Sequence, residues 1–265
     1  MKEIKVAVWN ISGASSGVHS PASVRKINEL QKNFSPDIAF YLEAPEGKCE
    51  FLPGVRSEKW ETSFRVGADD GGPRGILVVK YEKRGEEIKI IPFVNPKAKT
   101  AIGIRVFDRE KEFLRILGVW TTREDYEETL KGILRSFAPF LEKRDLPEAA
   151  RSVVTAVVAG DTNVNLDSEN VAAGKNTPDK CRNRREQWID EIGKYGLSLL
   201  NRPGVFTYRK KNSKPLFQCD LLMASSEEKL QIHSLGTERL SGGSDPFERW
   251  GSDHLPLLFS LQYDA

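Results

Sequence analysis

Apolar residues along this chain follow two spacings, one typical of strands and one typical of helices. Short apolar runs and alternating apolar positions predict strands, whereas apolar positions three or four residues apart predict helices. Strands are expected at 5–11, 38–42, 75–80, 88–93, 100–107, 113–120, 153–159, 205–208, 217–223, 230–235 and 255–262. Helices are expected at 23–34, 126–142 and 187–195.

The order of these elements predicts the fold class. Four strands between residues 75 and 120 follow one another without a helix, which favours antiparallel pairing. Elsewhere helices separate the strands, and this mixture is typical of an α/β protein in which two mainly antiparallel sheets pack face to face with helices outside. No long low-complexity linker divides the chain, so residues 1–265 are expected to form a single domain.

Composition and charge are those of an ordinary globular protein. Of the 265 residues, 39% are hydrophobic and 29% are charged, with a formal net charge of +2. These values exclude a disordered or collagen-like chain. No segment approaches the roughly 20 apolar residues of a membrane span, and the first residues have no signal-peptide core. We therefore expect a cytoplasmic monomer without a membrane partner.

Cysteine and histidine are too few and too scattered for a soft-ligand metal site. Cys49, Cys181 and Cys219 have no paired spacing, and the three histidines are equally far apart. Neither a zinc ribbon nor a disulfide framework fits this spacing. If the protein binds a metal, its ligands should be oxygens from Asp, Glu and Asn, which suit Mg²⁺ or Mn²⁺.

Four segments carry polar residues at points where a strand ends or begins. These residues are Asn10, Glu43, Asp161 with Asn163, and Asp253 with His254. Each is also an ordinary turn residue, so a turn explains any one of them alone. Asp161 and Asn163 are two positions apart, and they project from the same side if extended geometry continues past Gly160. A carboxylate and an amide would then converge on one phosphate and its attacking water.

These segments, in this order, resemble the endonuclease/exonuclease/phosphatase superfamily, which has the exonuclease III/deoxyribonuclease I-like fold. The matching segments are Trp9-Asn10-Ile11-Ser12-Gly13, Leu42-Glu43, Gly160-Asp161-Thr162-Asn163, Phe206-Thr207-Tyr208 with Asp220 on the following strand, and Ser252-Asp253-His254-Leu255-Pro256. The resemblance implies a four-layer α/β sandwich and metal-dependent cleavage of a phosphoester.

The resemblance also implies a metal site. By position, Asn10 and Glu43 would bind a divalent metal, with Asp253 close to it. Hard oxygen ligands of this kind hold Mg²⁺ or Mn²⁺, and the ion offsets the charge that develops on the phosphate.

Four further residues would act on the substrate if the resemblance holds. Asp161 would orient or deprotonate the attacking water, and Asn163 would hold a phosphate oxygen. Asp220 would orient His254 near the scissile phosphate. An Asp-His pair of this kind fixes one imidazole tautomer and stabilises the imidazolium.

The chain departs from the family pattern after the strand at 113–120. Many family members have a His or Tyr at the end of this strand, but this chain has Thr121, Thr122 and Arg123. Either a hydroxyl and a guanidinium take over the phosphate contact, or that contact is missing.

Basic residues are concentrated between Val171 and Pro215. Eleven basic residues face four acidic ones there, a local balance of +7. The loop after Asn163 is expected to place Arg182, Asn183 and Arg184 beside the site, where they would bind phosphates. For Arg209-Lys210-Lys211 a solvated hairpin tip explains the charge equally well.

Three functions compete at this point. The first is a metal-dependent nuclease or DNA phosphodiesterase, which the basic stretch and the similarity to 5′-tyrosyl-DNA phosphodiesterases favour. The second is a phosphatase or phospholipase that acts on a small or lipid phosphoester. The third is a non-catalytic binding module of the same fold, against which the intact set of polar residues counts. The residues do not separate the first two.

Overall fold

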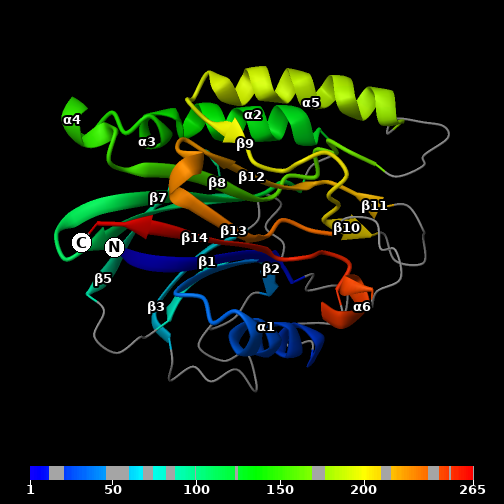
Figure 1. The fold of residues 1–265 in the computed structure, drawn as a ribbon, viewed down its shortest axis with the longest axis horizontal. Coiled ribbons are helices and arrows are strands. Elements are labelled where there is room, and N and C mark those ends of the chain that lie inside the picture. The colour runs from blue at the N-terminus through cyan, green and yellow to red at the C-terminus, as the bar shows by residue number, and fades with distance from the viewer. Residues whose placement is uncertain are drawn as a thin grey trace.

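Two six-stranded sheets packed face to face form the centre of the protein. The computed structural model describes residues 1–11, 21–45, 60–67, 74–81, 87–98, 100–122, 125–168, 177–209, 216–237, 245–250 and 252–264. Helix α1 (Pro21–Asn33) covers the outer face of one sheet, and α2 (Tyr126–Ser136) and α5 (Pro178–Gly193) cover the outer face of the other (Figure 1). The predicted four-layer α/β sandwich is confirmed.

Sheet A, the sheet beside α1, contains both ends of the described chain. Its order is β13 (Leu230–Ser234), β14 (Leu257–Tyr263), β1 (Lys2–Asn10), β2 (Ile38–Pro45), β4 (Arg74–Tyr81) and β3 (Trp60–Gly67). Strands β1 and β2 are parallel, because α1 connects them, and the other neighbours are antiparallel.

Sheet B lies beneath α2 and α5. Its order is β5 (Ile88–Phe93), β6 (Ala101–Asp108), β7 (Lys111–Trp120), β8 (Thr155–Asp161), β12 (Asp220–Ala224) and β9 (Ser198–Leu199). Only β7 and β8 are parallel, and the predicted mainly antiparallel pairing is therefore confirmed. The remaining elements are α3 (Ala138–Leu141), α4 (Glu148–Arg151), β10 (Tyr208–Arg209), β11 (Leu216–Phe217), a 3-10 turn (Glu227–Lys229) and α6 (Pro246–Trp250).

Apolar side chains form three layers. The central layer lies between the sheets and takes residues from both, including Phe40, Ile116 and Phe259. A second layer joins sheet B to α2, α3 and α5, and a third joins sheet A to α1. Alternation along each strand supplies one sheet face to the central layer and the other to an outer layer.

Two helices differ from the sequence prediction. The predicted helix 126–142 is divided into α2 and α3, because Pro139 has no amide hydrogen and its ring is crowded by the carbonyl one turn back. The predicted helix 187–195 begins earlier, at Pro178. Thr177 caps it by accepting a hydrogen bond from the Lys180 amide, and Pro178 occupies the first turn, where no amide hydrogen is needed.

Two predicted strands are shorter than expected. Within 205–208, Tyr208 is the one residue assigned to a strand, β10. The predicted strand 217–223 is divided into β11 and β12, because the backbone amides of Gln218 and Cys219 bond to Asp167 and Thr207 instead of a neighbouring strand. Within the described residues, no helix combines the length and apolar character needed to cross a membrane.

Candidate functional site

Strand alternation brings three predicted site residues to one end of the central layer. In β1, β8 and β12 every second side chain faces the opposite sheet, which gives each strand a row of inward-facing residues. Asn10, Asp161 and Asp220 are the last members of these rows, at the ends of the strands. The apolar members of the rows are Ile4, Val6 and Val8 in β1, Val157 and Ala159 in β8, and Leu222 and Ala224 in β12. Asp161 and Asp220 are also direct partners in the antiparallel pairing of β8 with β12.

The side chain of Asn10 connects the two sheets. Its Nδ2 donates to Glu43 Oε1 at 3.0 Å, within sheet A, and to Asp161 Oδ2 at 2.9 Å, in sheet B. Asn10 is completely buried and Asp161 almost so. A hydrogen bond to a charged, buried partner is among the stronger ones in proteins, so this amide fixes the positions of both carboxylates.

Glu43 occupies an irregular position near the end of β2. Its φ of 54° is left-handed, and the pairing of β2 with β4 shifts register between Tyr41 and Ala44. Ala44 packs in the layer beside α1, although uninterrupted alternation from Leu42 would place it in the central layer. The bulge thus resets the alternation and turns Glu43 toward Asn10, a use of backbone strain that is common at functional sites.

His254 is held from three sides. Its Nδ1 lies 3.0 and 3.1 Å from the two carboxylate oxygens of Asp220, and the Tyr208 ring lies 4.6 Å from the imidazole, centroid to centroid. Trp9 Nε1 donates to the His254 carbonyl at 3.0 Å. The remaining nitrogen, Nε2, is 3.9 Å from Asp161 Oδ2. The imidazole therefore lies between two carboxylates.

Burial and charge shift the proton affinities of this cluster. Burial raises the pKa of Asp161; nearby Asp220 raises it further, and His254 partly offsets both effects. Burial alone would lower the pKa of His254, but the Asp220 and Asp161 carboxylates outweigh it and raise that pKa above the usual value. The cluster is therefore organised around a protonated imidazole.

Known structures share this fold at low sequence identity. No protein-family model and no curated protein matches the chain. The AP endonuclease LMAP from Leishmania major is 12% identical, with a TM-score of 0.68 over 99% of this chain and 88% of that chain. An AP endonuclease from Archaeoglobus fulgidus is 17% identical, with a TM-score of 0.60 over 99% and 100%.

The endonuclease domain of TRAS1, a telomere-specific non-LTR retrotransposon, is 15% identical, with a TM-score of 0.59 over 100% of both chains. The chain has the endonuclease/exonuclease/phosphatase fold. The resemblance seen in the sequence is thereby confirmed at the level of the fold.

The endonuclease/exonuclease/phosphatase fold implies a divalent metal, and the oxygen donors of this site fit one. Asn10 contacts Glu43, and Lys26 interacts electrostatically with both Glu43 and Asp253, so these residues would offer a cation the amide and carboxylate oxygens that suit Mg²⁺ or Mn²⁺. Acidic groups are crowded here, because the nearby Asp220 carboxylate adds to the effect of burial in raising the pKa of Asp161. A cation bound by these donors would compensate that charge.

A second group of side chains has metal-ligating chemistry but fits a metal less well. Ligand atoms of Asp161, Cys219, Asp220 and His254 lie within 4.8 Å of one another. Burial raises the pKa of the Cys219 thiol well above its usual value, so the thiol stays protonated, and Asp220 already binds His254. We therefore treat the oxygen set, and not this group, as the candidate metal site.

A buried lysine that the sequence analysis missed lies beside the candidate metal site. Lys26 is 4% exposed, and its Nζ donates to the Ile11 carbonyl at 2.9 Å. Burial lowers its pKa, while Asp253 and Glu43 raise it. One signal was present: Lys26 is four residues before the apolar Leu30 and so lies on the buried face of the predicted helix.

Asn163 does not extend from the strand as expected. Strand β8 ends at Asp161, and Asn163 has a left-handed φ of 51°. Its backbone amide donates to Asp161 Oδ1 at 3.0 Å, and its Nδ2 donates to the Thr121 carbonyl at 2.9 Å. The prediction of continued extended geometry is wrong, because the Asp161 carboxylate closes a turn over Asn163.

The residues after β7 lie in different environments. Thr121 is buried, and its hydroxyl donates to the Thr162 carbonyl. Thr122 is half-buried, and Arg123 lies outside the described residues, as do Ser12 and Gly13 of the first motif. The Thr121 side chain is thus engaged in holding the β7 and β8 ends together, and Thr122 is the more accessible of the two threonines.

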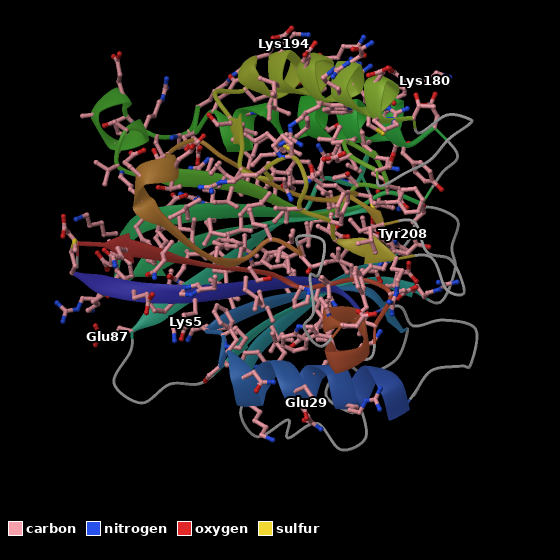
Figure 2. All side chains as sticks on the ribbon, turned by 45° about the vertical axis from the view of Figure 1, so that its right-hand side comes forward. Lys5, Glu29, Glu87, Lys180, Lys194 and Tyr208 are labelled. Carbon is pink, nitrogen blue, oxygen red and sulfur yellow. The ribbon has the colours of Figure 1, made fainter. Side chains whose placement is uncertain are left out.

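The arginines predicted to lie in a loop belong to helix α5. Arg182 pairs with Asp179 at 2.6 Å, and Asn183 is exposed. Arg184 pairs with Glu127 of α2 at 2.8 Å. The loop prediction is wrong, because the Thr177 cap begins the helix before these residues. Lys180 lies near the start of α5, and Lys194 is the residue at its C-terminal cap (Figure 2).

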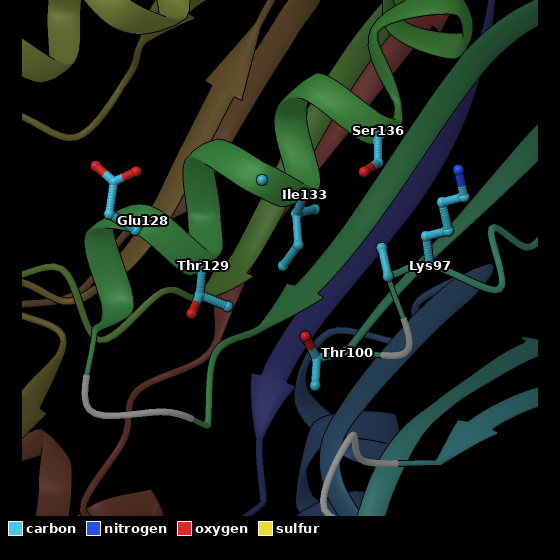
Figure 3. A pocket seen from close by; sticks show the side chains of 8 residues that line it. Lys97, Thr100, Glu128, Thr129, Ile133 and Ser136 are labelled. Carbon is cyan, nitrogen blue, oxygen red and sulfur yellow. The ribbon is translucent and has the colours of Figure 1, made fainter.

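A cavity of about 190 Å³ lies apart from the predicted site. Its lining comes from α2 and the β5–β6 connection (Figure 3): Lys97, Ala98, Thr100, Glu128, Thr129, Gly132, Ile133 and Ser136. The Thr100 hydroxyl is buried without a hydrogen-bond partner among the described residues. None of the predicted site residues lines this cavity, so we assign the chemistry to the hydrogen-bonded cluster at the end of the central layer.

Proposed function

We propose that the protein is a divalent-metal-dependent phosphodiesterase that hydrolyses nucleic acid, with DNA as the preferred substrate. The observation that carries the proposal is the continuous contact from Glu43 through Asn10 to Asp161, with the Asp220-His254 pair on the far side. This arrangement combines oxygen ligands for a metal, a base for water and a cation for phosphate within one buried cluster.

Asp161 is the proposed base. Its carboxylate is held by Asn10 and by the Asn163 amide, so its orientation is fixed before substrate binds. Its raised pKa makes it a better proton acceptor near neutral pH than an ordinary aspartate. Asp161 would accept the proton of the water that attacks phosphorus.

His254 is the proposed phosphate contact. Asp220 binds Nδ1, which leaves Nε2 to donate to a phosphate oxygen while the imidazole stays protonated. Positive charge placed before the reaction stabilises the charge that develops on phosphate oxygens. Asn10, Glu43 and Asp253 would hold Mg²⁺ or Mn²⁺, which supplies further charge neutralisation at the phosphate.

Two observations support a nucleic acid as substrate. The residues between 171 and 215 carry a balance of +7, and the similar structures include two AP endonucleases and the endonuclease domain of TRAS1. Thr122, Arg123, Arg182 and Asn183 remain proposed substrate contacts. Thr121 and Arg184 were predicted in the same role, but Thr121 is buried on the Thr162 carbonyl and Arg184 is held by Glu127, whereas the pair of Arg182 with Asp179 is exposed.

A substrate screen with added metal tests the proposal. We expect cleavage of single- or double-stranded DNA in Mg²⁺ or Mn²⁺ that stops in excess EDTA and in Asp161→Asn. Asp190→Asn, an exposed substitution on α5, is the matched control and should behave as wild type. Hydrolysis that persists in EDTA contradicts the proposed requirement for a divalent metal. Activity restricted to inositol phosphates or other small phosphoesters contradicts the nucleic-acid substrate, and a wild-type protein inactive on every substrate indicates a binding module.

A further inference from the structure

Arg74, which begins β4, binds the proposed metal ligand Glu43 directly. Its Nη1 lies 2.6 Å from Glu43 Oε2, while Asn10 Nδ2 occupies Oε1 at 3.0 Å. The pairing of Arg74 with Pro45 of β2 places the two side chains together at the same end of the sheet. Both oxygens of the Glu43 carboxylate therefore already carry hydrogen-bond donors.

A guanidinium and a divalent cation on the same carboxylate repel one another. At a separation of a few ångströms the repulsion between two charges remains substantial even with partial solvent screening. The Arg74 side chain is 43% exposed, and an ion pair of this exposure contributes little stability. Arg74 can therefore leave Glu43 at small cost.

The second cation beside Glu43 is constrained differently. Lys26 is nearly fully buried, and the Ile11 carbonyl accepts a hydrogen bond from its Nζ, so its ammonium is held in place. Arg74 begins a strand at the exposed rim, and its long side chain can swing toward bound substrate. A guanidinium offers a planar pair of donors that matches two phosphate oxygens.

We propose that Arg74 is an exchange residue: it holds Glu43 while the site is metal-free, and it releases Glu43 on metal binding to bind a phosphate of the substrate strand. This inference rests on the proposed function. It assigns Arg74 a substrate-binding role beside the reacting phosphate and makes it a competitor of the metal for one carboxylate.

Metal binding without substrate gives the first test. Isothermal titration with Mn²⁺ should show that Arg74→Gln binds the ion about 3- to 5-fold more tightly than wild type, because a competing cation is gone. Arg74→Lys retains the charge and should bind Mn²⁺ as wild type does. Arg109→Gln, on the remote β6–β7 turn, removes an exposed arginine that pairs with Glu87 and should change nothing.

Substrate binding gives the second test, with the opposite sign. We would measure the affinity of the Mn²⁺-loaded proteins for a cleavage-resistant phosphorothioate DNA duplex by fluorescence anisotropy at several salt concentrations. Arg74→Gln should bind about 10-fold more weakly, with a salt slope smaller by about 1, because one phosphate contact is lost. Arg74→Lys should also bind more weakly, because an ammonium cannot bind two oxygens at once.

The outcomes separate the inference from the function on which it rests. A wild-type protein that binds no Mn²⁺ overturns the proposed function. If wild type binds Mn²⁺ but Arg74→Gln shows no tighter binding, or binds DNA as wild type does, the exchange role is wrong while the phosphodiesterase stands. If Arg74→Gln does not fold, Arg74→Lys decides: unchanged Mn²⁺ affinity with weaker DNA binding supports the role, and unchanged DNA binding overturns it.

Discussion

Single side chains determine the protonation state of the candidate site. Asp220 contacts the imidazole with both oxygens, whereas Asp161 faces the other ring nitrogen without a direct hydrogen bond. The two carboxylates are partners in the same strand pairing, yet they have different environments. This difference allows Asp220 to hold the imidazolium while Asp161 accepts a proton. Paired acidic groups in enzymes often have two such separate roles.

Asp220→Asn should reduce turnover by about 10²- to 10⁴-fold, the range in which acid-base groups commonly contribute. The amide preserves shape but removes the charge that raises the His254 pKa, so the imidazole loses its proton more readily. Steady-state kinetics on a DNA substrate measure the effect. Met223→Leu, a volume-conserving change in the same strand whose side chain packs in the layer beside α2 and α5, is the control and should retain turnover within a few-fold. Equal activity of Asp220→Asn and wild type would show that the pair has no part in the reaction.

Strand ends with unusual backbone geometry position the site at the scale of whole elements. Glu43 reaches Asn10 through a bulge, and Gly160 precedes Asp161 with a φ of 151°. A Cβ at Gly160 would lie 1.9 Å from the Val119 carbonyl oxygen of the neighbouring strand. Only glycine allows β7 and β8 to approach this closely beside Asp161.

Gly160→Ala should therefore destabilise the protein by about 2 kcal/mol or more, because both the backbone conformation and the space are unsuitable. Gly132→Ala is the matched substitution. A Cβ there meets no atom within 4 Å, so removal of a mid-helix glycine in α2 should stabilise by about 0.5 to 1 kcal/mol. Urea unfolding measures both. Similar midpoints for Gly160→Ala and wild type would contradict the assigned crowding.

A buried tyrosine pair, on the face of sheet A that packs against α1, should make the stability of the protein fall at alkaline pH. The hydroxyl groups of Tyr41 and Tyr81 lie 2.6 Å apart. Burial raises the pKa of Tyr81 to about 12 and that of Tyr41 well above its usual value. The folded protein thus keeps protons that the unfolded chain loses above pH about 10, so stability should fall as pH rises past 10.

The double variant Tyr41→Phe/Tyr81→Phe isolates this effect. It removes both ionisable groups while it keeps their shape, so its stability should fall less between pH 8 and pH 11 than that of wild type. Urea unfolding at the two pH values provides the comparison. An equal loss in both proteins would assign the alkaline sensitivity to other groups.

The sequence predicts those parts of the fold and site that depend on local signals. Short apolar runs locate β1 and β8, and the polar residues at their ends identify Asn10 and Asp161. The bulge at Glu43 is not predictable this way, because it depends on the register of β2 against β4. Arg74 is missed for the same reason: its importance comes from a partner 31 positions away. The early start of α5 was predictable in part. The Thr177-Pro178 cap is visible in the sequence, but the first turns of the helix are mostly polar and show no apolar spacing.

The whole molecule is organised around a layer that neither sheet completes alone. The central layer takes side chains from both sheets, and the Asn10 to Asp161 hydrogen bond crosses between them. Separating the sheets would expose this apolar layer and break the hydrogen bond from Asn10 to Asp161. Burial of the central apolar layer and the hydrogen bond in the candidate site therefore both stabilise the packing of the two sheets against each other.

We predict that residues 1–265 unfold as one cooperative unit. Hydrogen exchange followed by mass spectrometry should give β1 in sheet A and β8 in sheet B the same opening free energy, because neither sheet buries its inner face without the other. Unfolding should follow a single transition by fluorescence and circular dichroism. A sheet that opens at markedly lower free energy than its partner would divide the chain into two units.

The hydrogen bond from Trp9 to the His254 carbonyl joins positions 245 residues apart, so the parts of the site are synthesised at different times. During synthesis the ribosome delivers Asn10 early and His254 late. A nascent chain that extends through Asp220 already contains β1 and β8, but it still lacks His254. Asp220 then has no imidazole to bind. Translation that stops before residue 254 therefore yields chains without the assembled cluster.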